Sequence, residues 1–276
     1  VYKRQQMGGT GVFAAAIRRA LLEDEVDMAV HSLKDLPVAP EPGLVIAGIP
    51  VREDPRDALV ARDGLTLGEL PAGAVVGTGS PRRAAQLQAL GLGFEIRDIR
   101  GNIDTRMGYV TSGELDGVIL ARAGLTRVER TGAISETIDP LQMLPAPGQG
   151  ALGLECREGD ARVIAALAEL DDADTRAAVT AERAVLGALE AGCAAPVGAL
   201  AEIVEEPDGS LEISLRAFVG APDGSFELRR SDVGSYDNPA AVGEALARTL
   251  LDDGAGAVIP PREAPNPTTS TKEAGA

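Results

Sequence analysis

The sequence has no tryptophan and few other aromatic residues. Aromatic residues make up only 3% of the 276 positions. Proteins that bind single-stranded nucleic acid stack the bases on aromatic side chains and attract the phosphates with a basic surface. This chain has few such rings and a net charge of −16. Nucleic acid and anionic membranes are therefore disfavoured as partners.

Cysteine, histidine and lysine are also scarce. Cys156 and Cys193 are the two cysteines, and they lie far apart in the sequence. This spacing excludes a disulfide framework and favours a reducing compartment, the cytoplasm. The sequence has no apolar run near the roughly 20 residues that a membrane-spanning helix needs. His31 is the one histidine, and Lys34 is the one lysine away from the chain ends.

The stretch around these two residues is the first candidate site. Residues 12–26 predict a helix with Arg18 and Arg19 on its polar face. The apolar run Met28–Val30, followed by His31-Ser32-Leu33-Lys34-Asp35-Leu36-Pro37, predicts a buried strand that ends in a loop. Ligands of open α/β sheets bind where strands end. We therefore expect an imidazole, a hydroxyl, an ammonium and a carboxylate at the mouth of a cleft, although a solvated loop with a surface ion pair fits the pattern equally well.

Arginines gather just after three predicted strands, at 74–77, 94–99 and 116–120. They are Arg82, Arg83, Arg100, Arg106, Arg122 and Arg127. Ser80 and Pro81 predict the start of a helix, where free N–H groups attract anions. Arginine binds carboxylates through two parallel hydrogen bonds. These strand ends predict a cleft for a ligand with several carboxylates, and a phosphate-rich ligand would fit the same pattern.

Two segments rich in charge, or in proline and glycine, divide the first part of the chain. They are residues 52–57 and residues 144–150. We interpret both as crossings between two α/β domains. One domain then comprises residues 1–50 and 151–170, and the other comprises residues 51–150.

The last third of the chain has a different pattern. A helix over 173–190 is followed by three predicted strands and a further helix, which predicts a smaller α+β domain over 171–263. Cys193 lies in a turn among small residues, where its thiol is accessible for covalent chemistry. Cys156 lies in an apolar strand and is predicted to be an inert core thiol. The tail, 264–276, is predicted to be disordered.

Six stretches resemble one enzyme family, the porphobilinogen deaminases, in order and in spacing. They are His31–Pro37, Arg52–Ala58, Gly77–Arg83, Arg100–Asn102 with Thr105–Arg106, Pro147–Ala151, and Gly192–Cys193. The resemblance implies a cytoplasmic, monomeric transferase. Such an enzyme joins four porphobilinogen molecules head to tail, with loss of ammonia, into the linear tetrapyrrole hydroxymethylbilane. It also implies two periplasmic-binding-protein-like α/β domains with a double crossover, a smaller C-terminal α+β domain, and a chain truncated at its amino terminus.

The same resemblance implies roles for individual residues. The catalytic carboxylate of the family falls on Asp35. The family carries a dipyrromethane cofactor, which a thioether attaches to one cysteine, and by position this is Cys193. Further cofactor-binding positions fall on Lys34, Ser80, Arg82 and Arg83, and substrate-binding positions fall on Ser32, Arg100, Arg106, Arg127 and Gln149. No metal is implied.

Two other functions stay open at this point. A solute-binding protein for a small anion would have a similar pair of domains and an arginine-lined cleft, and it would not need Cys193. A regulatory ligand-binding domain without catalysis also fits. Both alternatives predict no covalent pyrrole adduct and no release of ammonia.

Overall fold

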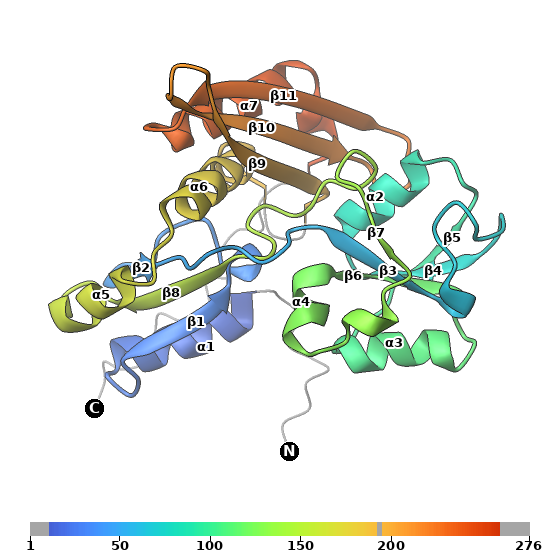
Figure 1. Ribbon diagram of the computed structural model, residues 1–276, viewed down its shortest axis with the longest axis horizontal. Coiled ribbons are helices and arrows are strands. Elements are labelled where there is room, and N and C mark those ends of the chain that lie inside the picture. The colour runs from blue at the N-terminus through green and yellow to red at the C-terminus, as the bar shows by residue number, and fades with distance from the viewer. Residues whose placement is uncertain (1–10, 192–194, 260–276) are drawn as a thin grey trace, which may run out of the picture.

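This computed structural model describes residues 11–191 and 195–259, whose strands form three sheets (Figure 1). The first sheet contains the earliest strand of the chain. Its strands are β1 (Met28–Ser32), β2 (Leu44–Gly48) and β8 (Leu152–Arg157). β8 lies in the centre and is antiparallel to both neighbours. α5 (Ala161–Ala168) packs against Cys156, while α1 (Gly11–Leu22) reaches Glu155, so the two helices cover opposite faces.

The second sheet has five strands in the order β5-β4-β6-β3-β7. They are β3 (Asp57–Ala61), β4 (Val75–Gly77), β5 (Glu95–Arg97), β6 (Gly117–Ala121) and β7 (Glu136–Thr137). β4 is parallel to β5 and β6, whereas β3 is antiparallel to its neighbours. α2 (Pro81–Ala89), α3 (Ile103–Thr111) and α4 (Arg122–Arg127) follow β4, β5 and β6 in the chain. This alternation confirms the predicted α/β class.

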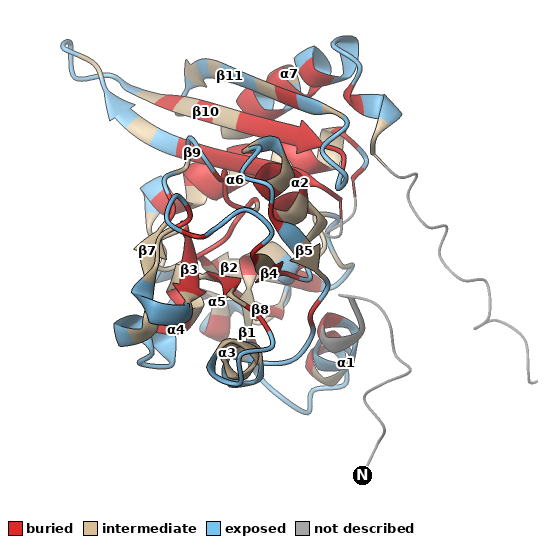
Figure 2. Ribbon diagram, turned by 90° about the vertical axis from the view of Figure 1, so that its right-hand side faces the viewer, coloured by how far each residue is buried: buried red, intermediate tan, exposed pale blue. Residues whose placement is uncertain are grey.

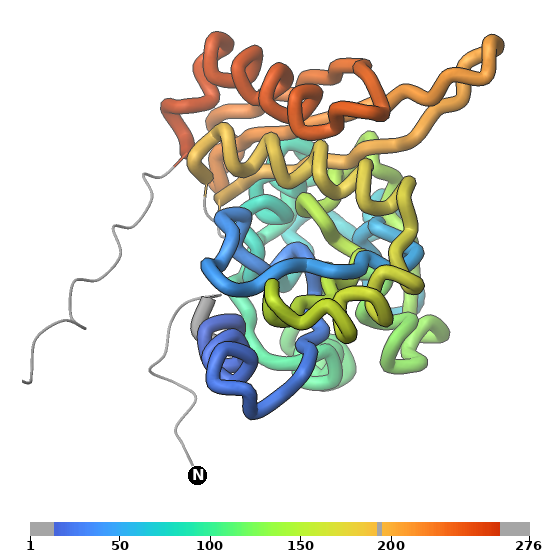
Figure 3. The backbone as a smooth tube through the Cα atoms, turned by 90° about the vertical axis from the view of Figure 1, so that its left-hand side faces the viewer, coloured from blue at the N-terminus to red at the C-terminus, as the bar shows by residue number. Residues whose placement is uncertain are grey.

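The C-terminal unit consists of α6 (Ala173–Ala188), β9 (Val197–Glu205), β10 (Leu211–Gly220), β11 (Glu227–Ser235) and α7 (Pro239–Asp252). Its strands form an antiparallel meander, and α6 and α7 run side by side against it (Figure 3). The helices approach closely because Gly243 has no side chain, since a Cβ there would lie 2.2 Å from the Ala181 carbonyl oxygen. Short 3-10 turns complete the described chain: η1 (Leu33–Asp35), η2 (Arg62–Gly64), η3 (Thr131–Ala133) and η4 (Ala255–Ala257).

The chain crosses between the first two sheets after β2 and again after β7, in the two segments where the sequence predicts crossings. The crossings touch, because the Glu53 N–H donates to the Gly150 carbonyl at 3.3 Å. Gly150 has φ +89°, and a Cβ there would lie 2.4 Å from the Glu53 carbonyl oxygen, so only glycine fits.

A single carboxylate holds both crossings. Glu182 of α6 is fully buried and accepts from the Arg52 guanidinium in the first crossing at 2.6 and 3.0 Å. It also accepts from the Gly148 N–H in the second crossing at 2.7 Å and from the Ala201 N–H of β9 at 2.9 Å. The crossings are therefore fixed to the C-terminal unit.

Two features of the first sheet differ from the sequence prediction. β1 is an edge strand with one face covered: Ala29 is buried, but Val30 is 53% exposed. α1 ends at Leu22, and Arg18 is buried instead of lying on a polar face. The reason is Glu155, whose carboxylate accepts from Arg18 at 2.8 Å. Apolar spacing does not identify a buried ion pair.

Burial follows the sheets (Figure 2). β3 is buried along most of its length, and so is the second half of β10. The last residues of β9 and the first residue of β10, which lie at the same end of the sheet, are mostly exposed. Cys156 is fully buried, which confirms its predicted place in the core, and burial raises the pKa of its thiol. The predicted tail at 264–276 lies outside the described residues.

Candidate active site

The loop after β1 carries Lys34 and Asp35 on the short turn η1. Leu33 and Leu36 are buried and anchor the loop in the core. Arg183 of α6 donates to three carbonyls of this loop, at 2.8–3.0 Å. The loop is thus fixed between the core and α6, with Lys34 half-buried and Asp35 exposed.

His31 does not join these two residues at the mouth of a cleft, and that expectation is wrong. Its side chain is 9% exposed, and Nε2 lies 3.1 Å from Oε2 of Glu155. Glu155 is itself buried between His31 and Arg18. Burial raises the pKa of Glu155, but the hydrogen bonds from His31 and Arg18 outweigh this and hold it below the usual range. A buried carboxylate needs such partners, and His31 serves as one of them.

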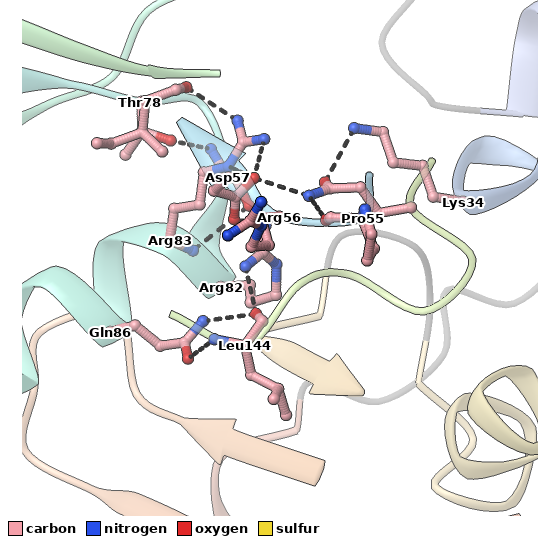
Figure 4. A network of polar contacts seen from close by, with 12 residues as sticks. Lys34, Pro55, Arg56, Asp57, Thr78, Arg82, Arg83, Gln86 and Leu144 are labelled. Atoms are coloured by element: carbon pink, nitrogen blue, oxygen red, sulfur yellow. Dashed lines mark hydrogen bonds and ion pairs between the residues drawn. The ribbon is translucent and has the colours of Figure 1, made fainter. Parts of the chain in front are cut away.

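Asp57, the first residue of β3, holds Arg82 and Arg83 together (Figure 4). All three side chains are buried. Arg82 donates from Nη2 to Oδ2 of Asp57 at 2.8 Å, and Arg83 donates from Nε and Nη2 to Oδ1 at 3.1 and 2.7 Å. Arg83 also donates from Nη1 to the Ile119 carbonyl at 3.0 Å. At this helix start two cations share one internal carboxylate, which leaves an excess of positive charge.

Gln149, in the second crossing, connects this cluster to Lys34. Its side chain is buried, and Nε2 donates to Oδ1 of Asp57 at 2.8 Å and to the Pro55 carbonyl at 2.7 Å. The Lys34 ammonium donates to Oε1 of Gln149 at 3.3 Å. Residues from four distant parts of the sequence therefore form one network (Figure 4). Because the amide of Gln149 is engaged inside the protein, its contact with substrate stays a prediction.

The pKa values of this network follow from burial and charge. Burial lowers the pKa of Lys34, and the charge of Arg83 lowers it further. Asp35 and Asp57 partly oppose this, and the result is about 8. Burial raises the pKa of Asp57, but the charges and hydrogen bonds of Arg82 and Arg83 outweigh it and hold that pKa well below its usual range. Asp57 is therefore ionised at neutral pH, and Lys34 loses its proton at a pH slightly above neutral.

The other predicted arginines lie around this network at different depths. Arg106 is half-buried, and burial, followed by the charge of Arg83, lowers its pKa. Arg127 is exposed and donates to the Gly150 carbonyl of the second crossing at 2.7 Å. The Arg100 side chain is 86% exposed.

The predicted serines lie at element ends, and the predicted cysteine is not described. Ser80 accepts from the Arg83 N–H at 3.5 Å and caps α2, which confirms the predicted helix start. Ser32 ends β1 and is half-buried. Cys193 lies outside the described residues.

Three buried polar residues of the site were not identified from the sequence: Asp57, Glu182 and Gln86. For Asp57 a signal existed, because adjacent arginines at a buried helix start require a carboxylate, and this Asp opens the strand after the first crossing. For Glu182 the signal was its place among the apolar residues of α6. Gln86 has no such signal, since its partner lies 58 positions away.

A cavity of about 570 Å³ lies between the first crossing, α6 and β9. Arg52, Pro55, Thr175 and Ile203 are among its lining residues, and neither Lys34 nor Asp35 is. This cavity therefore does not contain the Lys34–Asp35 loop. Within residues 11–191 and 195–259, no group of three or more His, Cys, Asp or Glu side chains could hold a metal ion. In the same ranges, no helix combines the length and apolar character needed to cross a membrane.

Comparison with known families gives two matches along the chain. Residues 2–165 match the dipyrromethane cofactor binding domain of porphobilinogen deaminase, and residues 176–252 match the C-terminal domain of the same enzyme. Together these matches cover most of the sequence.

Curated relatives are similar over most of their length. Porphobilinogen deaminase of Mycobacteroides abscessus is 62% identical over 255 residues, which is 91% of this chain and 83% of the relative. That of Nocardia farcinica is 63% identical and covers 90% of this chain and 72% of the relative. That of Mycobacterium tuberculosis is 60% identical and covers 90% and 81%.

Solved structures give only a weak likeness. A putative periplasmic sulfonate-binding protein from Methylobacillus flagellatus is 15% identical, with a TM-score of 0.37, over 62% of this chain and 51% of that one. A periplasmic domain from Bordetella pertussis is 16% identical, with a TM-score of 0.35, over 57% of this chain and 66% of that one. Scores this low do not support a solute-binding function.

Proposed function

The chain belongs to the porphobilinogen deaminase family, and from this membership we propose how its residues serve the reaction. It is a hydroxymethylbilane synthase, a transferase of tetrapyrrole biosynthesis. The enzyme joins four porphobilinogen molecules head to tail, with loss of ammonia. The observation that carries the residue roles is the network in which Arg82 and Arg83 contact the Asp57 carboxylate and Lys34 is joined to it through Gln149.

The positive charge of this network suits the substrate. Each porphobilinogen unit carries an acetate and a propionate, so the product gains carboxylates as it grows. The cluster has three cations against one buried carboxylate, in a chain whose net charge is −16. Such a local excess attracts anions that the rest of the surface repels. Arg100, Arg106, Arg127, Ser32 and Gln149 are proposed to extend this binding region toward incoming substrate.

Asp35 is proposed as the catalytic carboxylate. Loss of ammonia from the aminomethyl group leaves a positive charge on the substrate unit. Asp35 is exposed, lies next to Lys34 in the chain, and sits on a loop that Arg183 and two buried leucines hold in place. A carboxylate fixed in this way stabilises the charge, accepts hydrogen bonds from pyrrole N–H groups, and moves a proton at its oxygens.

The residues present fit a dipyrromethane cofactor, which the matched family domain binds. The donors are cationic, as its carboxylates require, and within the described residues the buried Nε of Arg82 has no hydrogen-bond partner. We propose that Lys34, Ser80, Arg82 and Arg83 hold it and that Cys193 anchors it through a thioether. When bound, the cofactor supplies the terminal pyrrole carbon to which the first substrate unit is joined.

We further propose three domains with the limits expected from the sequence: 1–50 with 151–170, then 51–150, then 171–263. The separate sheets and the double crossing support this division. A monomer and a cytoplasmic location are proposed on the family resemblance alone.

The intact mass of the purified protein, compared with Cys193→Ser, tests this function. We expect a covalent addition of two linked porphobilinogen units that the variant lacks. Cys156→Ala is the matched control and should keep the addition, since this thiol is buried in the first sheet. A protein that carries no addition and releases no ammonia from porphobilinogen would contradict the proposal.

A further inference from the structure

Gln86 lies fully buried on α2, one turn after Arg82 (Figure 4). Its side-chain amide binds both backbone groups of one residue in the second crossing. Nε2 donates to the Leu144 carbonyl at 3.0 Å, and Oε1 accepts from the Leu144 N–H at 2.7 Å. Gln86 thereby fixes Leu144 as a neighbouring strand would.

The same Leu144 carbonyl also accepts from Nη1 of Arg82 at 2.5 Å. The guanidinium of Arg82 thus has two fixed points, this carbonyl and the Asp57 carboxylate. Its Nε is buried and has no hydrogen-bond partner among residues 11–191 and 195–259. Because Gln86 holds the carbonyl, the orientation of Arg82 depends on Gln86 through Leu144.

Arg229 of β11 reaches Gln86 from the C-terminal unit. Its Nη2 donates to Oε1 of Gln86 at 3.3 Å, and its guanidinium carbon lies 5.0 Å from the centre of the Phe218 ring. Leu144 packs in the same region with Ala85 of α2 and with Leu200 and Phe218 of the C-terminal unit. The start of α2 and the second crossing are therefore both held against the C-terminal unit.

We propose that Gln86 is a positioning residue for Arg82, and that Arg229 extends its control to the C-terminal unit. The contacts run from Arg229 through Gln86 and the Leu144 peptide to Arg82. Packing alone does not explain Gln86, because an apolar side chain of similar size would fill the space without the cost of burying an amide. It follows that a shift of the C-terminal unit changes how Arg82 meets a carboxylate. The inference rests on the proposed role of Arg82 in binding carboxylates.

Gln86→Met tests the proposal, with Gln88→Met on the same helix as its matched control. The first measurement is hydrogen exchange of the Arg82 guanidinium in protein labelled with 15N-arginine, the signal being assigned by its loss in Arg82→Lys. We expect exchange to become about tenfold faster in Gln86→Met, because the Leu144 carbonyl loses its fixed position. Gln88→Met should leave the exchange rate unchanged.

The second measurement separates KM from kcat for porphobilinogen. Gln86→Met should raise KM about tenfold, with kcat within about twofold, because ligand binding weakens while the chemistry at Asp35 does not. Arg229→Met should raise KM as well. In the Gln86→Met background it should add less than it does alone, because Arg229 acts partly through Gln86 and partly through the Leu141 and Gln142 carbonyls, to which it donates at 3.2 and 3.4 Å.

Unchanged Arg82 exchange and unchanged KM in folded Gln86→Met would overturn the proposal. Additive effects of Arg229→Met and Gln86→Met would also overturn it. If Gln86→Met does not fold, Arg229→Met decides alone, because the Arg229 side chain is 34% exposed and methionine can still cover the Phe218 ring. Should Arg82→Leu leave both the covalent cofactor mass and KM unchanged, the proposed role of Arg82 in binding carboxylates fails instead, and the exchange measurement still decides whether Gln86 positions it.

Discussion

Asp57→Asn is the sharpest test of the cluster at the start of α2. Asparagine keeps the shape of the side chain but removes its charge. The buried guanidiniums of Arg82 and Arg83 then lose the carboxylate that lies 2.8 and 2.7 Å from their nitrogens. Removing one partner of a buried ion pair costs about 3–5 kcal/mol of unfolding free energy. We expect a loss in this range at pH 7, which is a large part of the total stability of an ordinary domain, about 5–15 kcal/mol.

The loss depends on pH in a defined direction. Burial raises the pKa of Asp57, but the charges of Arg82 and Arg83 outweigh it, so the pKa of the folded state lies below the ordinary value. The ionised carboxylate therefore contributes its full stabilisation above the unfolded pKa of about 3.9, and loses it as the pH falls through the lower folded value. The difference in unfolding free energy between the parent chain and Asp57→Asn should be constant from about pH 5 to 7, a range that lies roughly one unit or more above the unfolded pKa. This difference should shrink below about pH 4.

Urea unfolding followed by circular dichroism measures this difference, since the chain has no tryptophan to report by fluorescence. Asp104→Asn is the control, because Asp104 is 68% exposed and pairs with Arg130 at the surface. An exposed pair contributes about 0–1 kcal/mol. If Asp57→Asn loses no more than this control, Arg82 and Arg83 do not depend on Asp57, and the description of the cluster as a charge-paired centre fails.

Three further predictions concern single residues. Asp35→Asn should lower the turnover of porphobilinogen at least about a hundredfold without changing the urea midpoint, because Asp35 is exposed, and normal turnover would remove it from the mechanism. Burial and Arg83 lower the pKa of Lys34 to about 8, so the unfolded chain holds more protons above that pH. The unfolding free energy of the parent chain should therefore rise from pH 8 to 10, and a rise of equal size in Lys34→Met would refute this cause. Glu155→Gln should lose about 3 kcal/mol in urea unfolding, because buried Arg18 loses its closer and fully buried counter-ion and keeps only the more exposed Glu41, and an unchanged midpoint would contradict that.

Local signals in the sequence predict much of the fold. Ser80 and Pro81 mark the start of α2 correctly, and the segments before β3 and β8 are the crossings. The patterns fail where a tertiary partner decides. Arg18 lies on an expected polar face, yet Glu155 on a distant strand draws it into the interior. Val30 belongs to an apolar run, yet its strand lies at an edge.

The candidate site divides in the same way. Lys34, Arg82 and Arg83 could be identified from the sequence because cations are rare or conspicuous where they stand. Gln86 could not, since it owes its role to a partner brought close by the fold, and the only signal for Asp57 is the pair of adjacent arginines that need a carboxylate. The arginines at the helix start predict an anion site, but the sequence does not show that they already share an internal carboxylate.

The bonds of Glu182 have a mechanical consequence. One carboxylate on α6 joins both crossings to β9, so any rotation of the first sheet against the second has its pivot on this helix. The same helix holds the Lys34 loop through Arg183, and it ends a few residues before Cys193 in the sequence. Both crossings and the Lys34 loop are thus fixed to the same helix. A movement of the second sheet that keeps these bonds leaves the Lys34 loop in its place against α6.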